Sequence, residues 1–297
     1  MRTMSLLSIV IANYNYGRFI ETAIRSVVDQ CYGVEKCTDG IARLRIGNGF
    51  YAELIICDAA SSDNSIDIIR KYNDKITWWC SEKDNGQSDA FNKGFSHASG
   101  KYLTWLNADD LLMPNFFNRF IKVFEKNSDC EWFAGGCVNV DNELKILKCT
   151  LARRFSCYDA DCGSLCVYSP SSIFSRNLLN KVGGVNINYR GAMDTHLWNK
   201  FYRYEGVCYK LLPGYIFAFR FHEESRTTCN KFVNSIDKAR YERLCREFAN
   251  DMRMLREEFP KRRRASIIGR VVHLDWVRWI LSKIDTLIYK GRSITEI

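Results

Sequence analysis

Short apolar runs alternate with helix-patterned segments through residues 1–126, and this order limits the possible folds more than any other feature. Apolar runs at residues 6–11, 53–57, 76–80 and 102–106 predict buried strands. Apolar residues at helical spacing predict helices over residues 19–28, 63–72, 90–98 and 114–126. The alternation predicts an α/β fold with a doubly wound, mainly parallel sheet flanked by helices, in which ligands bind beyond the carboxyl ends of the strands.

Polar residues follow three of these strands. Asn13, Asp58 and the adjacent pair Asp109 and Asp110 would therefore meet at one edge of the sheet. Two adjacent carboxylates repel each other unless a cation lies between them, and hard oxygen ligands suit Mg²⁺ or Mn²⁺. Spacing alone leaves a second interpretation open, in which Asp109 or Asp110 caps the helix that begins near Pro114.

Several common enzyme classes lack their motifs in this chain. It has no GxGxxG after the first strand, no GxxxxGK[S/T] and no GxSxG, which disfavours dinucleotide dehydrogenases, P-loop NTPases and esterases. Its 13 cysteines are an odd number, and several lie in apolar runs, which indicates reduced thiols in a cytosolic protein. The cluster Cys157, Cys162 and Cys166 lacks zinc-knuckle spacing.

The positive charge is concentrated at the end of the chain. Of the formal net charge of +9, residues 260–297 carry nine basic and three acidic residues, or +6. The nearly neutral remainder argues against a nucleic-acid-binding body. Residues 265–289 interleave tryptophans and aliphatics with basic residues, which predicts a cationic helix lying on an anionic membrane surface. Packing of this helix on the body, or a homodimer, is the alternative.

No apolar run approaches the roughly 18 residues that a membrane-spanning helix needs. The first residues also lack the pattern of a signal peptide. We therefore expect a cytoplasmic protein, bound peripherally to the inner face of the plasma membrane.

Several motifs occur in an order that is familiar from one family. The segments SIVIANYNYG, ELIICDAASSDNS, SDAFNKG, LNADD and GAMDTHLW together resemble the family-2 glycosyltransferases of GT-A fold, particularly bacterial enzymes that build surface polysaccharides. The resemblance covers roughly residues 4–230. It implies a GT-A catalytic domain over residues 1–230 and a helical, basic extension over residues 231–297. This family transfers a sugar from a nucleotide-diphosphate donor, commonly with inversion and with a divalent metal.

The resemblance also implies a donor site. Ala12 and Asn13 would line the nucleotide pocket, and Asp58 would hydrogen-bond the base, which is usually uracil. Asp89 and Asn92 match the segment of the family that lines the donor pocket.

Metal and catalytic residues are implied in the same way. Asn107, Ala108 and Asp109 take the place of the D-x-D motif of the family, with Asp109 as a ligand of Mn²⁺ or Mg²⁺. His222 matches a position that contacts the metal or the diphosphate in some relatives, and Asp194 matches the general base. The alternative for His222 is a purely structural histidine, and the alternative for Asp194 is a helix cap.

Three features depart from the family pattern. Asn107 replaces the first acid of the D-x-D motif. Ala59 and Ala60 replace the Asp or Gly, and then the Gly, that usually follow Asp58 in the family. Residues 31–50 form a longer segment than usual, which we expect to be a surface excursion, with an acceptor-contacting or oligomer-forming loop as the alternative.

The sequence as a whole predicts a metal-dependent, inverting glycosyltransferase. It would move a sugar from a nucleotide-diphosphate donor, which we expect to be a UDP-sugar, to a polysaccharide or lipid-linked saccharide acceptor. A nucleotidyltransferase and a membrane-associated scaffold with a degenerate nucleotide-sugar site are the alternatives.

Overall fold

One mixed sheet forms the centre of the molecule. The computed structural model describes residues 5–36, 41–155, 167–225, 238–259 and 276–294. Its strands are β1 (Leu7–Asn13), β2 (Val34–Lys36), β3 (Ala42–Gly47), β4 (Phe50–Asp58), β5 (Trp78–Ser81), β6 (Tyr102–Asn107), β7 (Leu111–Leu112), β8 (Trp132–Val140), β9 (Ile146–Thr150), β10 (Ser172–Ser175) and β11 (Tyr209–Arg220).

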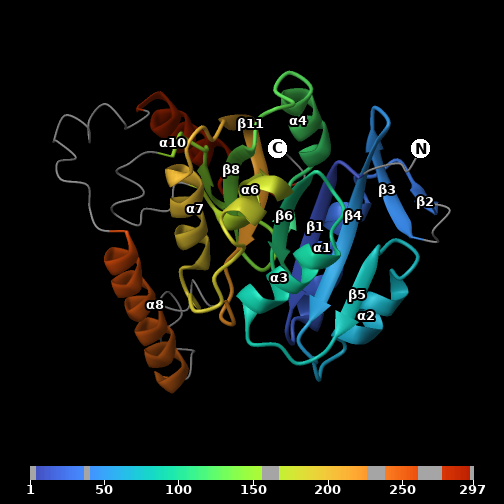
Figure 1. Ribbon diagram of the computed structural model, residues 1–297, viewed down its shortest axis with the longest axis horizontal. Helices are drawn as coiled ribbons and strands as arrows, with labels where there is room; N and C mark the ends of the chain where they lie inside the picture. The colour runs from blue at the N-terminus through green and yellow to red at the C-terminus, as the bar shows by residue number, and fades with distance from the viewer. Residues whose placement is uncertain (1–4, 37–40, 156–166, 226–237, 260–275, 295–297) are drawn as a thin grey trace.

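Helices cover both faces of this sheet (Figure 1). They are α1 (Gly17–Val28), α2 (Ser65–Lys71), α3 (Gln87–His97), α4 (Phe116–Phe124), α6 (Arg176–Lys181), α7 (Met193–Arg203), α8 (Lys238–Glu258) and α10 (Trp276–Tyr289), with a 3-10 turn, η1, at Ser169–Ser171.

The parallel half of the sheet is the one that the apolar runs predict. Strands β5, β4, β1 and β6 are parallel neighbours, in that order. The register pairs Asn13 with Asp58 and Ala12 with Asn107, so the polar residues after these strands meet at one edge. Beyond β6 the sheet becomes mixed, because β10 runs antiparallel to both β6 and β8. The predicted α/β sheet flanked by helices is confirmed.

Strand pleating divides the core between two faces. Ile9 and Ile11 of β1 pack in a cluster with α1, α2 and α4, whereas Val10 packs in a second cluster with α3, α6 and α7. Continuous apolar strands are needed because both faces are covered. The three tryptophans Trp105, Trp132 and Trp198 stack in the second cluster.

Residues 31–50 are part of the sheet, so the expected surface excursion is wrong for the residues that the structure describes. Strands β2 and β3 add to β4 in antiparallel order at one edge of the sheet. Ala42, Leu44 and Ile46 alternate along β3 and are buried, and the two larger side chains join the first core cluster. Period-2 alternation of this kind is the mark of a half-buried strand.

The C-terminal segments pack on the body. Helix α10 hydrogen-bonds β9, since the amides of Cys149 and Leu151 donate to Thr286 and Ser282. Helix α8 contributes Leu255 to the second core cluster. No helix in the described ranges is long and apolar enough to cross a membrane. The eight cysteines in those ranges are free thiols, as predicted, while Cys157, Cys162 and Cys166 lie outside them.

The β3 strand gives a test of this fold. Leu44 is fully buried, so Leu44→Ala should lower the free energy of unfolding by about 2–5 kcal/mol. Val34→Ala on the exposed strand β2 is the control and should change it by no more than about 0.5 kcal/mol. Urea denaturation measures both, and equal small effects would show that β3 does not belong to the core.

Candidate active site

The ends of β1 and β4 are joined by side chains. Asn13 is buried, and its Nδ2 donates to Asp58 Oδ1 over 2.6 Å and to Ser61 Oγ over 3.2 Å. The other carboxylate oxygen of Asp58 accepts from Ser81 Oγ at 2.6 Å and from the Ser61 amide at 2.9 Å. Ser61 Oγ also donates to Asp58 Oδ1 at 2.5 Å, so the carboxylate already accepts four hydrogen bonds. Asp58 therefore holds the loop that follows β4, and its contact with a nucleotide base stays a prediction.

The loops after these two strands support each other. Asn15 and Ala60 both have a φ of 55°, in the left-handed region where glycine is favoured. Asn15 Oδ1 accepts from the Ser62 amide, and the Asn15 amide donates to Ser61 Oγ, both at 2.8 Å. The alanine in place of a family glycine is thus accommodated at a strained position by cross-linked loops.

Asn107 begins a buried polar network at the end of β6. Its Nδ2 donates to Asp110 Oδ2 at 2.8 Å, and its Oδ1 accepts from Gln87 Nε2 at 2.7 Å. Asp110 is fully buried and also accepts from the Arg220 amide at 3.0 Å. Burial and the neighbouring charge of Asp109 raise the pKa of Asp110 well above its ordinary value. Ala108, buried beside them, donates its amide to the Ala12 carbonyl.

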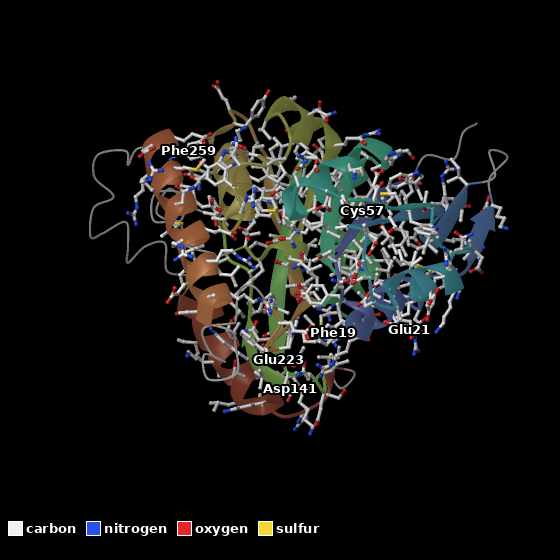
Figure 2. All side chains as sticks on the ribbon, turned by 90° about the horizontal axis from the view of Figure 1, so that it is seen from below. Phe19, Glu21, Cys57, Asp141, Glu223 and Phe259 are labelled. Atoms are coloured by element: carbon white, nitrogen blue, oxygen red, sulfur yellow. The ribbon has the colours of Figure 1, made fainter. Side chains whose placement is uncertain are left out.

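Asp109 faces His222 across the site. The His222 Nε2 lies 2.9 Å from Asp109 Oδ2, and both side chains are buried. Aromatic rings enclose the imidazole, with the Phe19 ring 4.5 Å away and the Tyr16 ring 5.8 Å away. Figure 2 shows Phe19 of α1 and Glu223, which follows His222, at the same end of the molecule, and Arg18 pairs with Glu223 at 3.2 Å.

These contacts decide between the two interpretations of the acidic pair. The N-cap of α4 is Asn115, and the first amide of the helix, that of Phe116, donates to Gln30 Oε1 at 3.0 Å. Asp109 and Asp110 instead bond His222, Asn107 and the backbone of β11. The helix-cap interpretation of the pair is therefore wrong.

A divalent metal fits this donor set only when a ligand supplies further oxygens. Within the described ranges, no group of three or more His, Cys, Asp or Glu residues could hold a metal ion. The carboxylate of Asp109 and the imidazole of His222 supply two donors that already lie 2.9 Å apart. Neighbouring ligands at about 2.1 Å from an octahedral ion lie about 3 Å apart, and Mg²⁺ usually binds through one or two carboxylates plus phosphates. The residues therefore fit a metal that is shared with a diphosphate.

Arg220 is a cation buried beside the two acids. It is 4 % exposed, with its guanidinium 4.8 Å from the Phe19 ring centre. Its Nε and Nη2 make no hydrogen bond. A buried cation with unused donors needs an explanation, and a phosphate is the group that a guanidinium fork matches best.

The two site residues expected from α3 make different contacts. Asp89, in the first turn, accepts from the Asn85 amide at 3.0 Å. Asn92 uses both sides of its amide on the backbone of Val185, at 2.7 and 3.0 Å. Asn92 therefore joins α3 to the turn after α6, and its role in a donor pocket stays a prediction.

Asp194 lies in the first turn of α7 and is half-buried. Its Oδ2 accepts from Ser169 Oγ at 2.6 Å, and its Oδ1 accepts from the Thr195 amide at 2.7 Å. Burial raises the pKa of Asp194, while the hydrogen bonds from Ser169 and Thr195 act against this rise. Oδ1 of Asp194 thus accepts a backbone hydrogen bond at the start of α7, and Oδ2 is held by the hydroxyl of Ser169 in η1.

Helix α3 links Asp194 to the ends of the strands. Ser88 Oγ donates to the Tyr189 carbonyl at 3.1 Å and lies 3.1 Å from Met193 Sδ. The preceding residue, Gln87, binds Asn107. The first turn of α3 therefore touches both the end of β6 and the start of α7, and Asp194 belongs to the same region as the polar network.

Sequence reasoning missed Gln87 and Ser169. Gln87 lies inside the segment that precedes SDAFNKG, and its position two residues before Asp89 was the available signal. Ser169 had none, because its contact with Asp194 joins positions 25 residues apart.

Proteins of similar sequence include glycosyltransferases. The chain is 33% identical over 123 residues to an uncharacterized glycosyltransferase of Nostoc, a match over 40% of this chain and 33% of that protein. It is 26% identical over 197 residues to an Escherichia coli enzyme, the UDP-Glc:alpha-D-GlcNAc-diphosphoundecaprenol beta-1,3-glucosyltransferase WfgD, over 65% of this chain and 68% of the enzyme. The chain spans 33% to 60% of the length of the first curated relatives it matches.

A solved structure shares the fold. The mannosyltransferase PcManGT of Pyrobaculum calidifontis, in complex with GDP-Man and Mn²⁺, aligns with a TM-score of 0.51 over 95% of this chain and 86% of that chain, at 14% identity. The family model of glycosyl transferase family 2 matches residues 8–182, which include the strand ends and the acidic pair. The chain therefore belongs to glycosyl transferase family 2, with the GT-A fold of that family.

Proposed function

We propose that the protein is an inverting glycosyltransferase that moves a sugar from a UDP-linked donor to a lipid-linked saccharide acceptor. The observation that carries this proposal is the arrangement of two separate carboxylate groups in one family-2 framework. Asp109 lies with His222 and Arg220 at the strand ends, and Asp194 lies at the start of α7. The name of the E. coli relative supports the class of donor and of acceptor.

Asp194 is the proposed general base. A single displacement at the anomeric carbon requires that the acceptor hydroxyl lose its proton as it attacks. The carboxylate of Asp194 is held at two oxygens by Ser169 and Thr195 and retains further lone pairs. Its ionised form is the competent one, so activity should fall as the pH drops through its raised pKa.

The departing diphosphate needs positive charge on the side of the sugar opposite the proposed base. Arg220 would supply two hydrogen-bond donors from a fixed position over Phe19. Asp109 and His222 would hold Mn²⁺ or Mg²⁺, which when bound neutralises charge that develops on the leaving group. Ala12 and Asn13, at the end of β1, would line the nucleotide pocket, with Asp58 near the base.

The base assignment can be tested directly. Asp194→Asn keeps the size of the side chain and a hydrogen-bond acceptor for Ser169, but it cannot take a proton. We expect kcat to fall by roughly 10²–10⁴-fold, while UDP affinity stays within about twofold. Turnover of a UDP-sugar panel and calorimetric titration of UDP measure the two quantities. Full turnover by the variant would remove Asp194 from the role.

The wild-type pH profile provides a second readout of this residue. Because burial raises the pKa of Asp194, the acidic limb of kcat should lie above the ordinary range of an aspartate. Absence of turnover by the wild type across the panel would favour a degenerate site instead.

The metal site has its own test. Asp109→Asn removes the negative charge but keeps a partner for His222. We expect it to weaken Mn²⁺-dependent UDP binding by at least about tenfold, because the carboxylate is one of two protein donors. Titration of UDP with and without Mn²⁺ measures the effect, and wild-type affinity that does not depend on metal would contradict this role.

We also propose that the protein binds an anionic membrane surface through α10. One side of this helix packs on β9, where Ser282 and Thr286 accept backbone hydrogen bonds. The other side exposes aliphatic residues, of which Leu287 is 82% exposed. These exposed residues, which we call the outer face of α10, are Ile280, Leu281, Ile284, Leu287 and Ile288.

Charge favours a membrane over a second copy of the chain as the occupant. Lys283, Lys290 and Arg292 are exposed around the outer face of α10. Each such residue contributes about 1 kcal/mol beside an anionic leaflet, whereas a homodimer would bring like charges together. A lipid-linked acceptor would lie in the membrane that the outer face of α10 binds.

Point substitutions test the membrane proposal better than truncation of the C-terminal segment does. Ile294 is buried in the body, so its deletion would damage the core. Leu287→Glu should lower binding to anionic phosphatidylglycerol vesicles severalfold, since it places a charge in the apolar face. Val34→Glu on β2 is the control and should bind as the wild type does. Sedimentation with anionic and neutral vesicles measures binding. A dimer that Leu287→Glu dissociates, with vesicle binding unchanged, would contradict the membrane proposal.

A further inference from the structure

Helix α8 holds the turn that leads into the proposed base. Oδ2 of Asp251 accepts from the Gly191 amide at 2.6 Å and from the Ala192 amide at 2.9 Å. Asp251 is 1 % exposed, although its helix is otherwise highly charged. A carboxylate this deeply buried persists only where hydrogen bonds compensate for its lost hydration.

A second attachment lies two helical turns further along α8, on the same face. Glu258 accepts from the Tyr189 hydroxyl at 2.8 Å and lies 3.0 Å from His196 Nε2. The Tyr189 and His196 rings stack with their centres 4.2 Å apart. Phe259, labelled at the end of α8 in Figure 2, has its ring centre 5.6 Å from that of His196.

Apolar packing fills the space between these two attachments. Leu255 is buried and belongs to the same core cluster as Met193 and Leu197 of α7. The face of α8 formed by Asp251, Leu255 and Glu258 therefore holds the chain on both sides of Asp194, from residue 189 to residue 196.

The start of α7 depends on this support from outside. Its N-cap is Ala192, whose side chain makes no capping hydrogen bond. Asp251 supplies the missing anion near the positive end of the helix dipole. Asp194 lies two residues after Ala192, so movement of this turn would carry the carboxylate with it.

We propose that Asp251 is a positioning residue for catalysis, which fixes the turn at Gly191 and Ala192 and thereby the place of the Asp194 carboxylate. This inference rests on the proposed role of Asp194 as general base. It gives the C-terminal segment a part in the reaction, because α8 then belongs to the machinery that orients the base.

The experiment compares three variants in the full-length protein. Asp251→Ala should lower kcat by roughly 10- to 100-fold, since a displacement near 1 Å has effects of this size. The donor KM and the UDP affinity should stay within about twofold, because the strand-end residues are untouched. Asp251→Asn keeps an oxygen that accepts from both amides and should recover most of kcat. Glu257→Ala removes an exposed acid of the same helix that pairs with Arg253, and it should behave as the wild type.

The outcomes separate this inference from the proposed function. Wild-type kcat in Asp251→Ala, or an equal loss of UDP affinity and kcat, would overturn the positioning role. Should that variant not fold, Glu258→Ala takes its place, because the Glu258 side chain is 40% exposed. A lower kcat with unchanged UDP affinity supports the inference there, and an unchanged kcat overturns it. Undiminished turnover by Asp194→Asn would instead overturn the proposed function.

Discussion

The buried acids at the end of β6 are the constraint on which the site depends. Asp110 is fully buried and Asp109 is 7 % exposed, so each carboxylate must find partners. Asp110 takes them from Asn107 and the backbone of β11, and Asp109 takes His222. These bonds draw the end of β11 against β6 and bring Arg220 beside the pair. In the proposed function, a cation shared with a diphosphate would offset the repulsion between these two neighbouring acids.

The sequence predicted the parallel half of the fold because local pattern determines it. Continuous apolar strands such as β1 and β4 can only be buried on both faces, and the polar residues that follow them must meet at one edge. Asn13, Asp58 and Asp109 were found in this way. Residues 31–50 were misjudged although Ala42, Leu44 and Ile46 alternate with polar residues, which is the pattern of a half-buried strand, because the segment is longer than its counterpart in the family.

Contacts made through tertiary packing could not be predicted. Ser169 meets Asp194 across 25 positions, and Asp251 meets Gly191 across 60. In sequence, Asp251 is one more charge in a charged helix, and only the structure distinguishes it from exposed acids such as Glu257. The proposed site therefore combines strand-end residues that local pattern encodes with a proposed base, Asp194, whose side chain is held by distant segments.

The central claim is a single displacement in which Asp194 deprotonates the acceptor. The stereochemistry of the product tests this most directly, through proton NMR of the anomeric signal during transfer from an α-linked UDP-sugar. One displacement inverts the anomeric centre, so the account predicts a β-linked product from the first turnover. An α-linked product would contradict it, because retention requires a different reaction course.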